Sequence, residues 1–458
     1  KIPSKVEIIK KFTFNGCKYL KEVIFSNNSQ LHSIKDNSFS GDLSLEKINL
    51  PKTIKKLSHM AFINTPSLES ILNESNQYFN VLEDKTVYEN DCSLVFVPRT
   101  VQKFAIDKKC QIIHSGAFCG PNLQEVSFHD SLLSNIGQLS FAHCTALKEI
   151  TIPKSVEKIG EETFIGCQNL EKVVFEKESQ IKEIPKFCFA FSGLKFIDLP
   201  QSIEKIGNSG FYFCINLKRI NLHETNVLYI GRNAFLDTDF EEVKFPSSLR
   251  FIGNNAFGGN KSLARIDFSE IPEVISCQTK AKLNNFLSSI IPKYFAIDKE
   301  SQKGNKPYKE NVTVESTSLE NTNLDSKDIE NEFSNYSTDN EDENSDNEEE
   351  TLQNESINNN TKVVAQKEPT YSSSACFIEE NAFCNLFVKL FVFNLKSYMW
   401  FSFFDRCGRI DEYIVNDNIH LILQKCKKSM RDSLAGSLYK VVQMKWLCKD
   451  NVPLLYNQ

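Results

Sequence analysis

The sequence predicts an α/β-type repeat solenoid with a parallel β-sheet, followed by a disordered linker and a small C-terminal segment. Three observations lead to this prediction: a phenylalanine that returns at nearly constant spacing, a strand-like segment after each of these phenylalanines, and a change of composition after residue 275. The chain has 458 residues, more than one ordinary compact core holds. Stacked repeats account for such a length without several separate cores.

The recurring unit centres on a phenylalanine with an aliphatic residue five positions before it. Nine of the ten copies carry Ile there and one carries Leu57. The copies are 22 to 25 residues apart, except for one gap of 56 between Phe62 and Phe118. We expect a column of inward phenylalanines, each stabilising the fold by roughly 2–3 kcal/mol through burial. The ten anchors are Phe14, Phe39, Phe62, Phe118, Phe141, Phe164, Phe189, Phe211, Phe235 and Phe257.

Each anchor is followed by a segment in which apolar and polar residues alternate, as in a strand with one buried face. The stretch "LEKVVF" at 170–175 is typical of these segments. One strand and one turn cannot bury such a face, whereas stacked coils cover one another and align their strands in a parallel sheet. Glycines four residues before an anchor are expected to permit a sharp corner there. They are Gly160, Gly207, Gly231 and Gly253.

The unit resembles the BspA-like, or treponema-type, leucine-rich repeats, whose phrase reads SIGxxAFxxCxxLKxIxIP. The stretches "IGRNAFLDTDFEEVKFP" (230–246) and "SVEKIGEETFIGCQNLEKVVF" (155–175) fit this phrase closely, and the resemblance covers residues 1–275. Residues 76–106, inside the long gap, predict a β-hairpin with a turn near Asn90 and Asp91, similar to the hairpin interruption of that family. The resemblance implies a cell-surface protein of a microbe or protist that acts in adhesion to host cells or matrix.

Beyond the repeats the sequence predicts three further segments. Residues 276–299 are a candidate cap of the solenoid, and residues 300–373, rich in Asn, Ser, Glu and Asp, predict a disordered acidic linker. The C-terminal segment 374–458 contains a partial repeat, an apolar stretch at 386–404 and a helical pattern at 417–447. For 386–404 three interpretations stand: further repeat strands, a membrane span, or a degenerate tail. Lys389 and Lys396 inside the stretch disfavour a span, because charge at mid-membrane is costly.

The polar residues predict no catalytic, cofactor or metal site. Four cysteines lie three residues after an anchor, where Thr, Pro and Ser also occur, so we expect packing there rather than ligation. The seven histidines form no HExxH pattern, and CxxC, GxSxG and GxGxxG motifs are absent from the sequence. A net charge of −6 gives no bias toward nucleic acid. The four cysteines are Cys17, Cys144, Cys167 and Cys214.

The remaining candidate site is a surface. Side chains between the buried strand positions are expected to face outward and to form columns along the stacked coils. Most are polar, and Phe196 is an outward aromatic of the kind that anchors protein interfaces. The candidate binding face comprises Lys47, Asn49, Glu149, Thr151, Lys172, Val174, Phe196, Asp198, Arg219, Asn221, Glu242 and Lys244.

We therefore predict a non-enzymatic protein that needs no cofactor and binds protein, or a matrix or host-surface ligand, through this face. The resemblance favours a cell-surface or secreted location, with membrane association through 386–404 as one option. The alternative is a cytoplasmic interaction scaffold, since free cysteines and an acidic linker suit a reducing compartment. The chain begins at Lys1 with no signal-like segment before the repeats, so its N-terminus indicates neither compartment. The sequence leaves the oligomeric state open.

Overall fold

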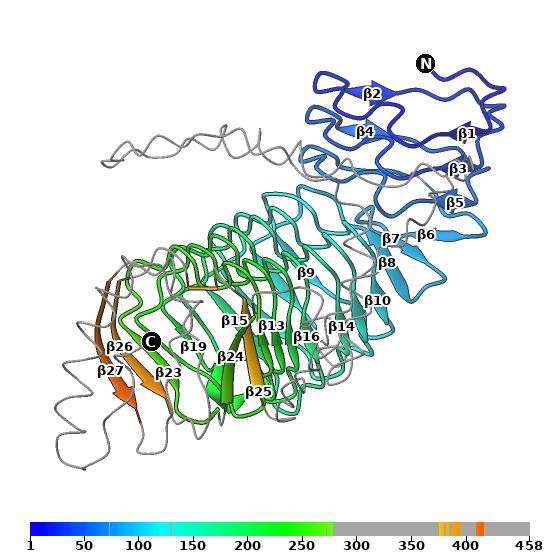
Figure 1. Cartoon of the computed structure of the whole chain (residues 1–458). Helices are drawn as coiled ribbons and strands as arrows, with labels where there is room; N and C mark the ends of the chain where they lie inside the picture. Colours follow the sequence, from blue (N-terminus) through cyan, green and yellow to red (C-terminus); the bar gives the residue numbers. More distant parts are fainter. Residues whose placement is uncertain are drawn as a thin grey trace, which may run out of the picture. The chain divides into compact units, whose positions relative to one another are not determined.

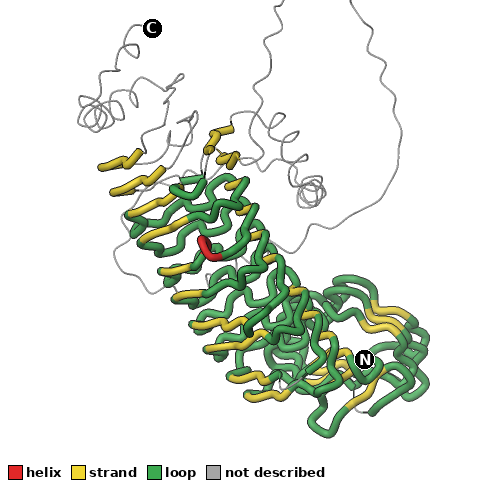
Figure 2. The backbone as a smooth tube through the Cα atoms, turned by 90° about the horizontal axis from the view of Figure 1, so that it is seen from below, coloured by secondary structure: helices red, strands yellow, loops and turns green. Residues whose placement is uncertain are grey.

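The described residues of this computed structural model are 1–72, 74–128, 131–271, 273–277, 375–379, 382–383, 387–393 and 409–415. They belong to one compact unit and form a parallel β-solenoid of about eleven coils, which confirms the predicted fold class (Figure 1). Short strands alternate with long turns along the stack (Figure 2). The helical content of the described residues is the 3₁₀ turn η1 (Leu222–Glu224) alone.

The first strand of each coil leads into the phenylalanine turn. Its aliphatic residue, five positions before the anchor, pairs with the same position of the next coil, as Ile113 does with Ile136 and Ile230 with Ile252. These side chains are buried. Because equivalent residues pair between successive coils, the repeat length in the sequence is the length of one coil. The row contains β1 (Ile8–Ile9), β3 (Ser33–Ile34), β5 (Lys56–Leu57), β10 (Ile112–Ile113), β12 (Asn135–Ile136), β14 (Lys158–Ile159), β16 (Glu183–Ile184), β18 (Lys205–Ile206), β20 (Tyr229–Ile230) and β22 (Phe251–Ile252).

The second strand of each coil follows the turn and corresponds to a predicted alternating segment, except β9, which follows the meander inside the stretch 76–106 predicted as a hairpin. In β13 and β15 the buried residues Ile150 and Val173 are paired, while Glu149 and Lys172 beside them are exposed. The row contains β2 (Glu22–Val23), β4 (Lys47–Ile48), β9 (Lys103–Ala105), β11 (Glu125–Ser127), β13 (Glu149–Ile152), β15 (Lys172–Phe175), β17 (Phe196–Ile197), β19 (Arg219–Ile220), β21 (Glu242–Lys244) and β23 (Arg265–Phe268).

The anchor phenylalanines form two stacked columns inside the solenoid. Consecutive rings from Phe14 to Phe62 have centroids 5.1 and 5.3 Å apart. From Phe118 to Phe257 each ring stacks on the next at 4.8–5.3 Å. All anchors are buried except Phe14, which lies in the first coil and is half-buried. The predicted phenylalanine column is therefore confirmed, with a break between Phe62 and Phe118.

In eight of the ten anchor turns the backbone adopts the left-handed region both two residues before and two residues after the phenylalanine; beside Phe62 and Phe118 one position does, Asn64 and Gly116 respectively. In the coil of Phe235, for example, φ is +54° at both Asn233 and Asp237, two residues before and two after the anchor. Glycine takes one of these two positions in several coils, as Gly166 does after Phe164 with φ +69°. This double reversal aims the ring into the core, and it favours Gly, Asn and Asp at the flanking positions.

The glycines four residues before the anchors have a different role from the one expected. None of Gly160, Gly207, Gly231 and Gly253 has a positive φ, so a sharp corner is not the reason for glycine. A Cβ on Gly160 would lie 2.3 Å from the Gln138 nitrogen of the preceding coil. A Cβ on the other three would lie 2.6–2.8 Å from atoms of the preceding coil. Glycine is required here because adjacent coils approach too closely for a side chain.

The position three residues after the anchor points inward, as the sequence predicts for its cysteines. Cys144, Cys167 and Cys214 are fully buried, and their thiols donate to the anchor carbonyl of the preceding coil at 3.0–3.4 Å. Cys17, in the first coil, is exposed. In the second coil Asp42 occupies this position, and its Oδ1 accepts from the Cys17 N–H at 2.8 Å. Its other oxygen is buried without a hydrogen-bond partner.

The buried Asp42 predicts an acid-dependent contribution to stability. Burial raises the pKa of its carboxyl to about 7, against a small opposing effect of the Cys17 hydrogen bond. The folded state then holds a proton that the unfolded state releases near pH 4, so stability falls as pH rises from about 4 to about 7, by at most about 1.4 kcal/mol per pH unit. We expect Asp42→Asn to be more stable than the unchanged protein at pH 8 and nearly equal to it at pH 4.5. Urea denaturation at both pH values measures this.

Asp36 provides a control of opposite sign. Its pKa is lowered, first by the Ser58 hydroxyl and then by Lys11, whose Nζ lies 3.0 Å from Asp36 Oδ2. Asp36→Asn should therefore be less stable than the unchanged protein near neutral pH. The difference should disappear when the pH falls below the lowered pKa of Asp36. If Asp42→Asn shows the same pH dependence as Asp36→Asn, Asp42 is ionised in the fold and the interpretation is wrong.

The long gap in the repeat holds an antiparallel meander of β6 (Phe79–Val81), β7 (Val87–Glu89) and β8 (Ser93–Phe96). The second turn contains Asn90 and Asp91, both with positive φ, and β8 then pairs in parallel with β10 of the next coil. Side chains of the meander enter both hydrophobic cores of the solenoid: Val95 packs in the first and Leu94 in the second. The meander therefore joins the coils on either side of the break.

Arg99 fastens the end of this meander to both neighbouring coils. It is fully buried, and its main-chain N–H donates to the Leu68 carbonyl at 2.9 Å. Its guanidinium donates to the carbonyls of Ala117 and Gly116 at 2.7 and 2.9 Å and lies over the Phe96 ring. These hydrogen bonds compensate in part for burying this cation, whose Nε has no partner, and the two carbonyls also accept the main-chain N–H groups of Val97 and Cys119.

The last described coil comes from the C-terminal segment. Strand β25 (Ala375–Glu379) lies between β22 and β24 (Glu273–Cys277), with Ile378 paired to Ile252, and Phe383 stacks on Phe257 at 5.3 Å. Strands β26 (Phe387–Phe393) and β27 (Arg409–Val415) extend the second row beyond β23. The apolar stretch is thus a strand over 387–393. Within the ranges that the structure describes, no helix has the length and apolar character needed to cross a membrane.

The other predicted segments lie outside the described residues. These are the linker 300–373, the helical pattern 417–447, the remainder of 386–404 and, apart from its first two residues, the candidate cap 276–299.

Candidate functional site

The predicted binding face consists of side chains that point away from the core. Among its twelve residues, nine are exposed and three are half-buried, so the alternation expected from the sequence holds in the fold. The exposed residues are Lys47, Asn49, Glu149, Thr151, Lys172, Phe196, Asp198, Arg219 and Glu242; the half-buried ones are Val174, Asn221 and Lys244.

Charges on this face are paired between neighbouring coils. Lys172 Nζ lies 3.5 Å from Glu149 Oε2, and Lys47 Nζ lies 3.5 Å from Glu69 Oε2. Lys244 forms a closer pair with Glu270, at 2.7 Å. Each exposed pair contributes little to stability. Their effect on the surface is larger: opposite charges in register cancel, so the face offers a polar, nearly neutral surface rather than a field of one sign.

Two of the predicted residues are engaged within the solenoid itself. The Asn221 side-chain amide accepts from the Leu199 N–H at 2.7 Å and donates to the Leu199 carbonyl at 3.1 Å. These two hydrogen bonds link adjacent coils just after the end of strand β17. Lys244 is held by Glu270, as described above. Both have fewer groups to offer a ligand than the exposed residues of the face.

Phe196 is the centre of an aromatic and charged cluster on β17 and β19. Its side chain is 37% exposed although it stands on a strand of the sheet. Arg219, its register partner, places its guanidinium 5.7 Å from the ring centroid, and Arg219 Nη2 lies 3.9 Å from Asp198 Oδ1. Arg is among the residues that most often anchor protein interfaces, and an accessible aromatic ring beneath its guanidinium adds apolar area of the kind enriched there.

A second apolar group lies in the turns, which sequence reasoning did not single out. Phe191 stacks on Phe213 at 5.6 Å and meets Tyr212 edge-on at 5.3 Å. Phe213 is exposed, and so is the nearby Ile215, at 61%. Both positions fall in turns, where the repeat does not require an apolar residue. An apolar residue at such a position is the sequence signal that could have indicated this exposed group.

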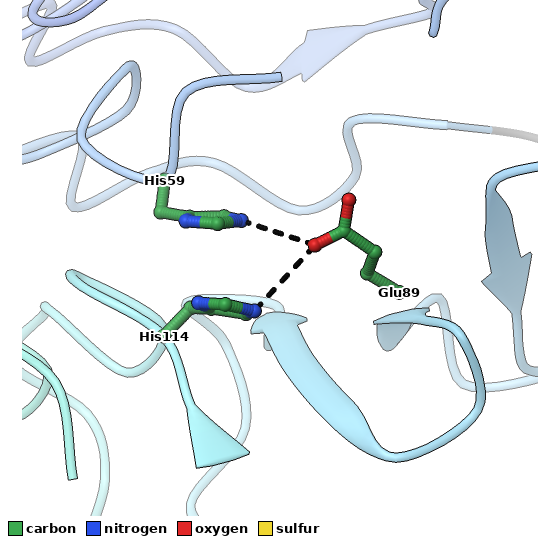
Figure 3. Close-up of side chains that lie close together, drawn as sticks. All are labelled: His59, Glu89 and His114. Carbon is green, nitrogen blue, oxygen red and sulfur yellow. Dashed lines mark ion pairs between the residues drawn. The ribbon is translucent and has the colours of Figure 1, made fainter. Parts of the chain in front are cut away.

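The structure also brings together three residues that the sequence kept apart. His59 precedes Phe62, His114 precedes Phe118, and Glu89 ends strand β7 of the meander (Figure 3). The two imidazole rings stack with centroids 3.5 Å apart and planes 16° from parallel. Glu89 Oε2 lies 3.5 Å from His59 Nε2 and 3.6 Å from His114 Nε2. Both Nε2 atoms are buried from solvent and have no hydrogen-bond partner.

Both imidazoles of this cluster are held neutral. Burial lowers the pKa of His59, with Glu89 opposing, and lowers that of His114 to about 4, with His59 adding to the effect. The three side chains present two neutral imidazole nitrogens and one carboxylate oxygen within 4.8 Å of one another, a set able to hold a metal ion. The sequence offered no motif for it, because these residues are 30 and 25 positions apart.

The stacked coils, the two rows of parallel strands and the inward aliphatic and phenylalanine positions define a leucine-rich repeat protein. A family model described as "BspA type Leucine rich repeat region (6 copies)" matches residues 1–104, 93–196 and 182–291, well over half of the chain. The chain therefore belongs to this family, as its repeat phrase indicates. No curated protein matches the sequence.

Solved structures that are similar to this chain include a leucine-rich repeat protein, a leucine rich cell surface protein and a vaccine antigen. One from Eubacterium ventriosum is 20% identical, with a TM-score of 0.48, covering 56% of this chain and 81% of its own. A leucine rich cell surface protein from Faecalibacterium prausnitzii is 19% identical, with a TM-score of 0.36, covering 60% and 64%. The pneumococcal vaccine antigen PcpA is 13% identical, with a TM-score of 0.32, covering 76% and 88%.

Proposed function

We propose that this chain is a non-enzymatic binding protein that engages another protein, at a cell surface or in a host matrix, through the face formed by the second row of strands. The observation that carries the proposal is the cluster of Phe196, Asp198 and Arg219, an accessible aromatic with charged neighbours on a rigid sheet. Membership of the BspA-type family supports a role in adhesion or host interaction.

The arrangement of the sheet suits a large, flat partner better than a small molecule. Strands from successive coils hold their outward side chains in register, so a partner meets a preformed surface and little ordering entropy is lost on binding. The neutral, paired charges favour short-range contacts over long-range steering. The ring of Phe196 supplies apolar area to bury, and its polar neighbours can orient the partner.

The inward cysteines support a non-enzymatic role. Burial raises the pKa of both Cys167 and Cys214 to about 12, so these thiols stay protonated near neutral pH. A protonated, inaccessible thiol is a poor nucleophile, and their hydrogen bonds to main-chain carbonyls give them a structural role. The intracellular interaction scaffold is the second candidate, favoured by these same reduced cysteines.

Removing the sheet-face cluster is expected to abolish most binding. We expect the Phe196→Ala/Arg219→Ala double variant to bind an immobilised basement-membrane matrix about 30-fold more weakly than the unchanged protein, because the pair together should contribute about 2 kcal/mol, the threshold of an interface hot spot. Surface plasmon resonance on the immobilised matrix measures the change. Thermal unfolding of the variant should stay nearly the same, since both side chains are accessible.

The matched control removes exposed apolar groups elsewhere. Phe213→Ala/Ile215→Ala alters the turn surface and should leave matrix binding unchanged. Loss of binding in this control alone would move the interaction to the turns and contradict the sheet-face assignment. If the unchanged protein does not bind matrix and is not labelled by a membrane-impermeant reagent on intact cells, adhesion is wrong and the intracellular scaffold remains.

A further inference from the structure

We propose that His59, Glu89 and His114 form a binding site for a divalent transition-metal ion, zinc being the best match, and that the ion fastens the coils on either side of the break in the repeat. Three residues converge there from the coil of Phe62, from strand β7 of the meander and from the coil of Phe118 (Figure 3). This inference is independent of the sheet face and goes beyond a binding role for the solenoid.

The distances in the cluster fit a zinc coordination sphere. Ligand atoms at about 2.0–2.1 Å from a tetrahedral zinc lie about 3.3 Å from one another. The Glu89 oxygen is 3.5 and 3.6 Å from the two imidazole nitrogens, so an ion between the three atoms needs only small movements. Two imidazoles and one carboxylate form a mixed nitrogen and oxygen set that suits zinc, and a tetrahedral zinc with three protein ligands keeps a fourth position for water.

The two rings must tilt to serve one ion. An imidazole lone pair lies in the ring plane, and two stacked rings with centroids 3.5 Å apart and planes 16° from parallel do not direct both lone pairs at one atom. A rotation of each ring toward Glu89 opens the stack and directs both Nε2 atoms at the ion. Stacking of two neutral imidazoles contributes little that would oppose this, and both nitrogens lack hydrogen bonds that would be broken.

An ion at this location would stabilise the solenoid at the break in the repeat. The ring stack of the anchors ends at Phe62 and resumes at Phe118, and the hydrophobic side chains divide into two cores at the same place. The coils nevertheless touch: a Cβ on Gly116 would lie 2.4 Å from Ile63 Cδ1. An ion bound by His59 and His114 would link these two coils directly. It would replace, at the break, the cohesion that ring stacking provides elsewhere.

Zinc binding to the metal-stripped full-length chain tests the proposal. We expect one zinc to be bound through this site, with a higher thermal midpoint and slower amide exchange around residues 59–63 and 112–116. His114→Gln and the isosteric Glu89→Gln should each weaken zinc binding by more than about 10-fold, since even groups that only orient metal ligands affect affinity by about 10–100-fold. Cobalt, used as a spectroscopic substitute, should show an absorption spectrum of nitrogen and oxygen ligation in the unchanged protein and lose it in these two variants.

His32→Gln is the matched control, because His32 Nε2 also lies beside a carboxylate, 3.9 Å from Glu7 Oε2, but is outside the three-residue cluster. It should bind zinc as the unchanged protein does. Glu89→Gln keeps the shape of the side chain, so a folded Glu89→Gln protein with lost zinc affinity supports the site even if the histidine variants unfold. Zinc binding that persists in both Glu89→Gln and His114→Gln, or a cobalt spectrum of thiolate ligation, would overturn the proposal. So would an unchanged protein that binds no zinc.

Discussion

Phe164→Ala is expected to lower the free energy of unfolding by about 3–5 kcal/mol, the usual cost of removing a buried phenylalanine. Phe164 is fully buried and stacks on Phe141 and Phe189, each at 5.3 Å. Its removal empties one level of the column and takes a stacking partner from both neighbouring coils. Because each coil of a solenoid is stabilised by its neighbours, the effect should spread to both of them. Urea denaturation followed by circular dichroism measures the change.

Phe14→Ala is the matched control for this column. Phe14 belongs to the first coil, is half-buried and stacks on Phe39 at 5.1 Å. With one stacking partner in the column and residual exposure, it should cost less than half as much as Phe164→Ala. Equal midpoints for Phe164→Ala and the unchanged protein would show that the column does not stabilise the fold.

Gly160→Ala is the second large effect, expected to cost about 3 kcal/mol, the upper end for overpacking a well-packed site. The added Cβ would lie 2.3 Å from the Gln138 nitrogen and 2.6 Å from the Gly137 carbonyl carbon. Both are main-chain atoms, so no side-chain rotation relieves the clash. The main chain of Gly137 is hydrogen-bonded to the preceding coil, from its N–H to the Ile113 carbonyl at 2.8 Å, which limits its movement.

Gly210→Ala separates this clash from the general effect of replacing glycine. Its Cβ would meet its nearest neighbour, the Gly207 carbonyl oxygen, at 3.3 Å, and its φ is not positive. We expect a change of less than about 1 kcal/mol, as for a site that needs only a small adjustment. Thermal unfolding of both variants measures the difference. Similar midpoints for the two would contradict the assignment of Gly160 to close approach between coils.

Much of the solenoid follows from local sequence. The aliphatic residue before each anchor, the anchor itself and the alternating strand each recur with the length of one coil, and the inward positions are buried as the pattern predicts, apart from the half-buried Phe14. A repeated unit repeats its environment, so one correct interpretation serves every copy. The outward columns of the sheet are predictable for the same reason, since side chains alternate along a strand.

The reason for an individual residue was harder to predict than its position. Gly160 and its equivalents look like corner residues in the sequence, yet their backbone is ordinary and the restriction comes from the neighbouring coil. Asp42 occupies the inward cysteine position, where its burial and raised pKa depend on the coils around it. Both effects involve distance to another part of the chain, which a single repeat does not contain.

The coil, its length, its buried column and its outward face can be predicted from the sequence, because they depend on periodicity within and between neighbouring repeats. Tertiary structure alone decided which coil completes the stack, since Phe383 lies against Phe257 across more than a hundred intervening residues. It also decided the cluster of His59, Glu89 and His114, which no spacing rule connects. The break in the repeat and the path of the meander bring these three together, and both are long-range contacts that packing of the whole solenoid sets.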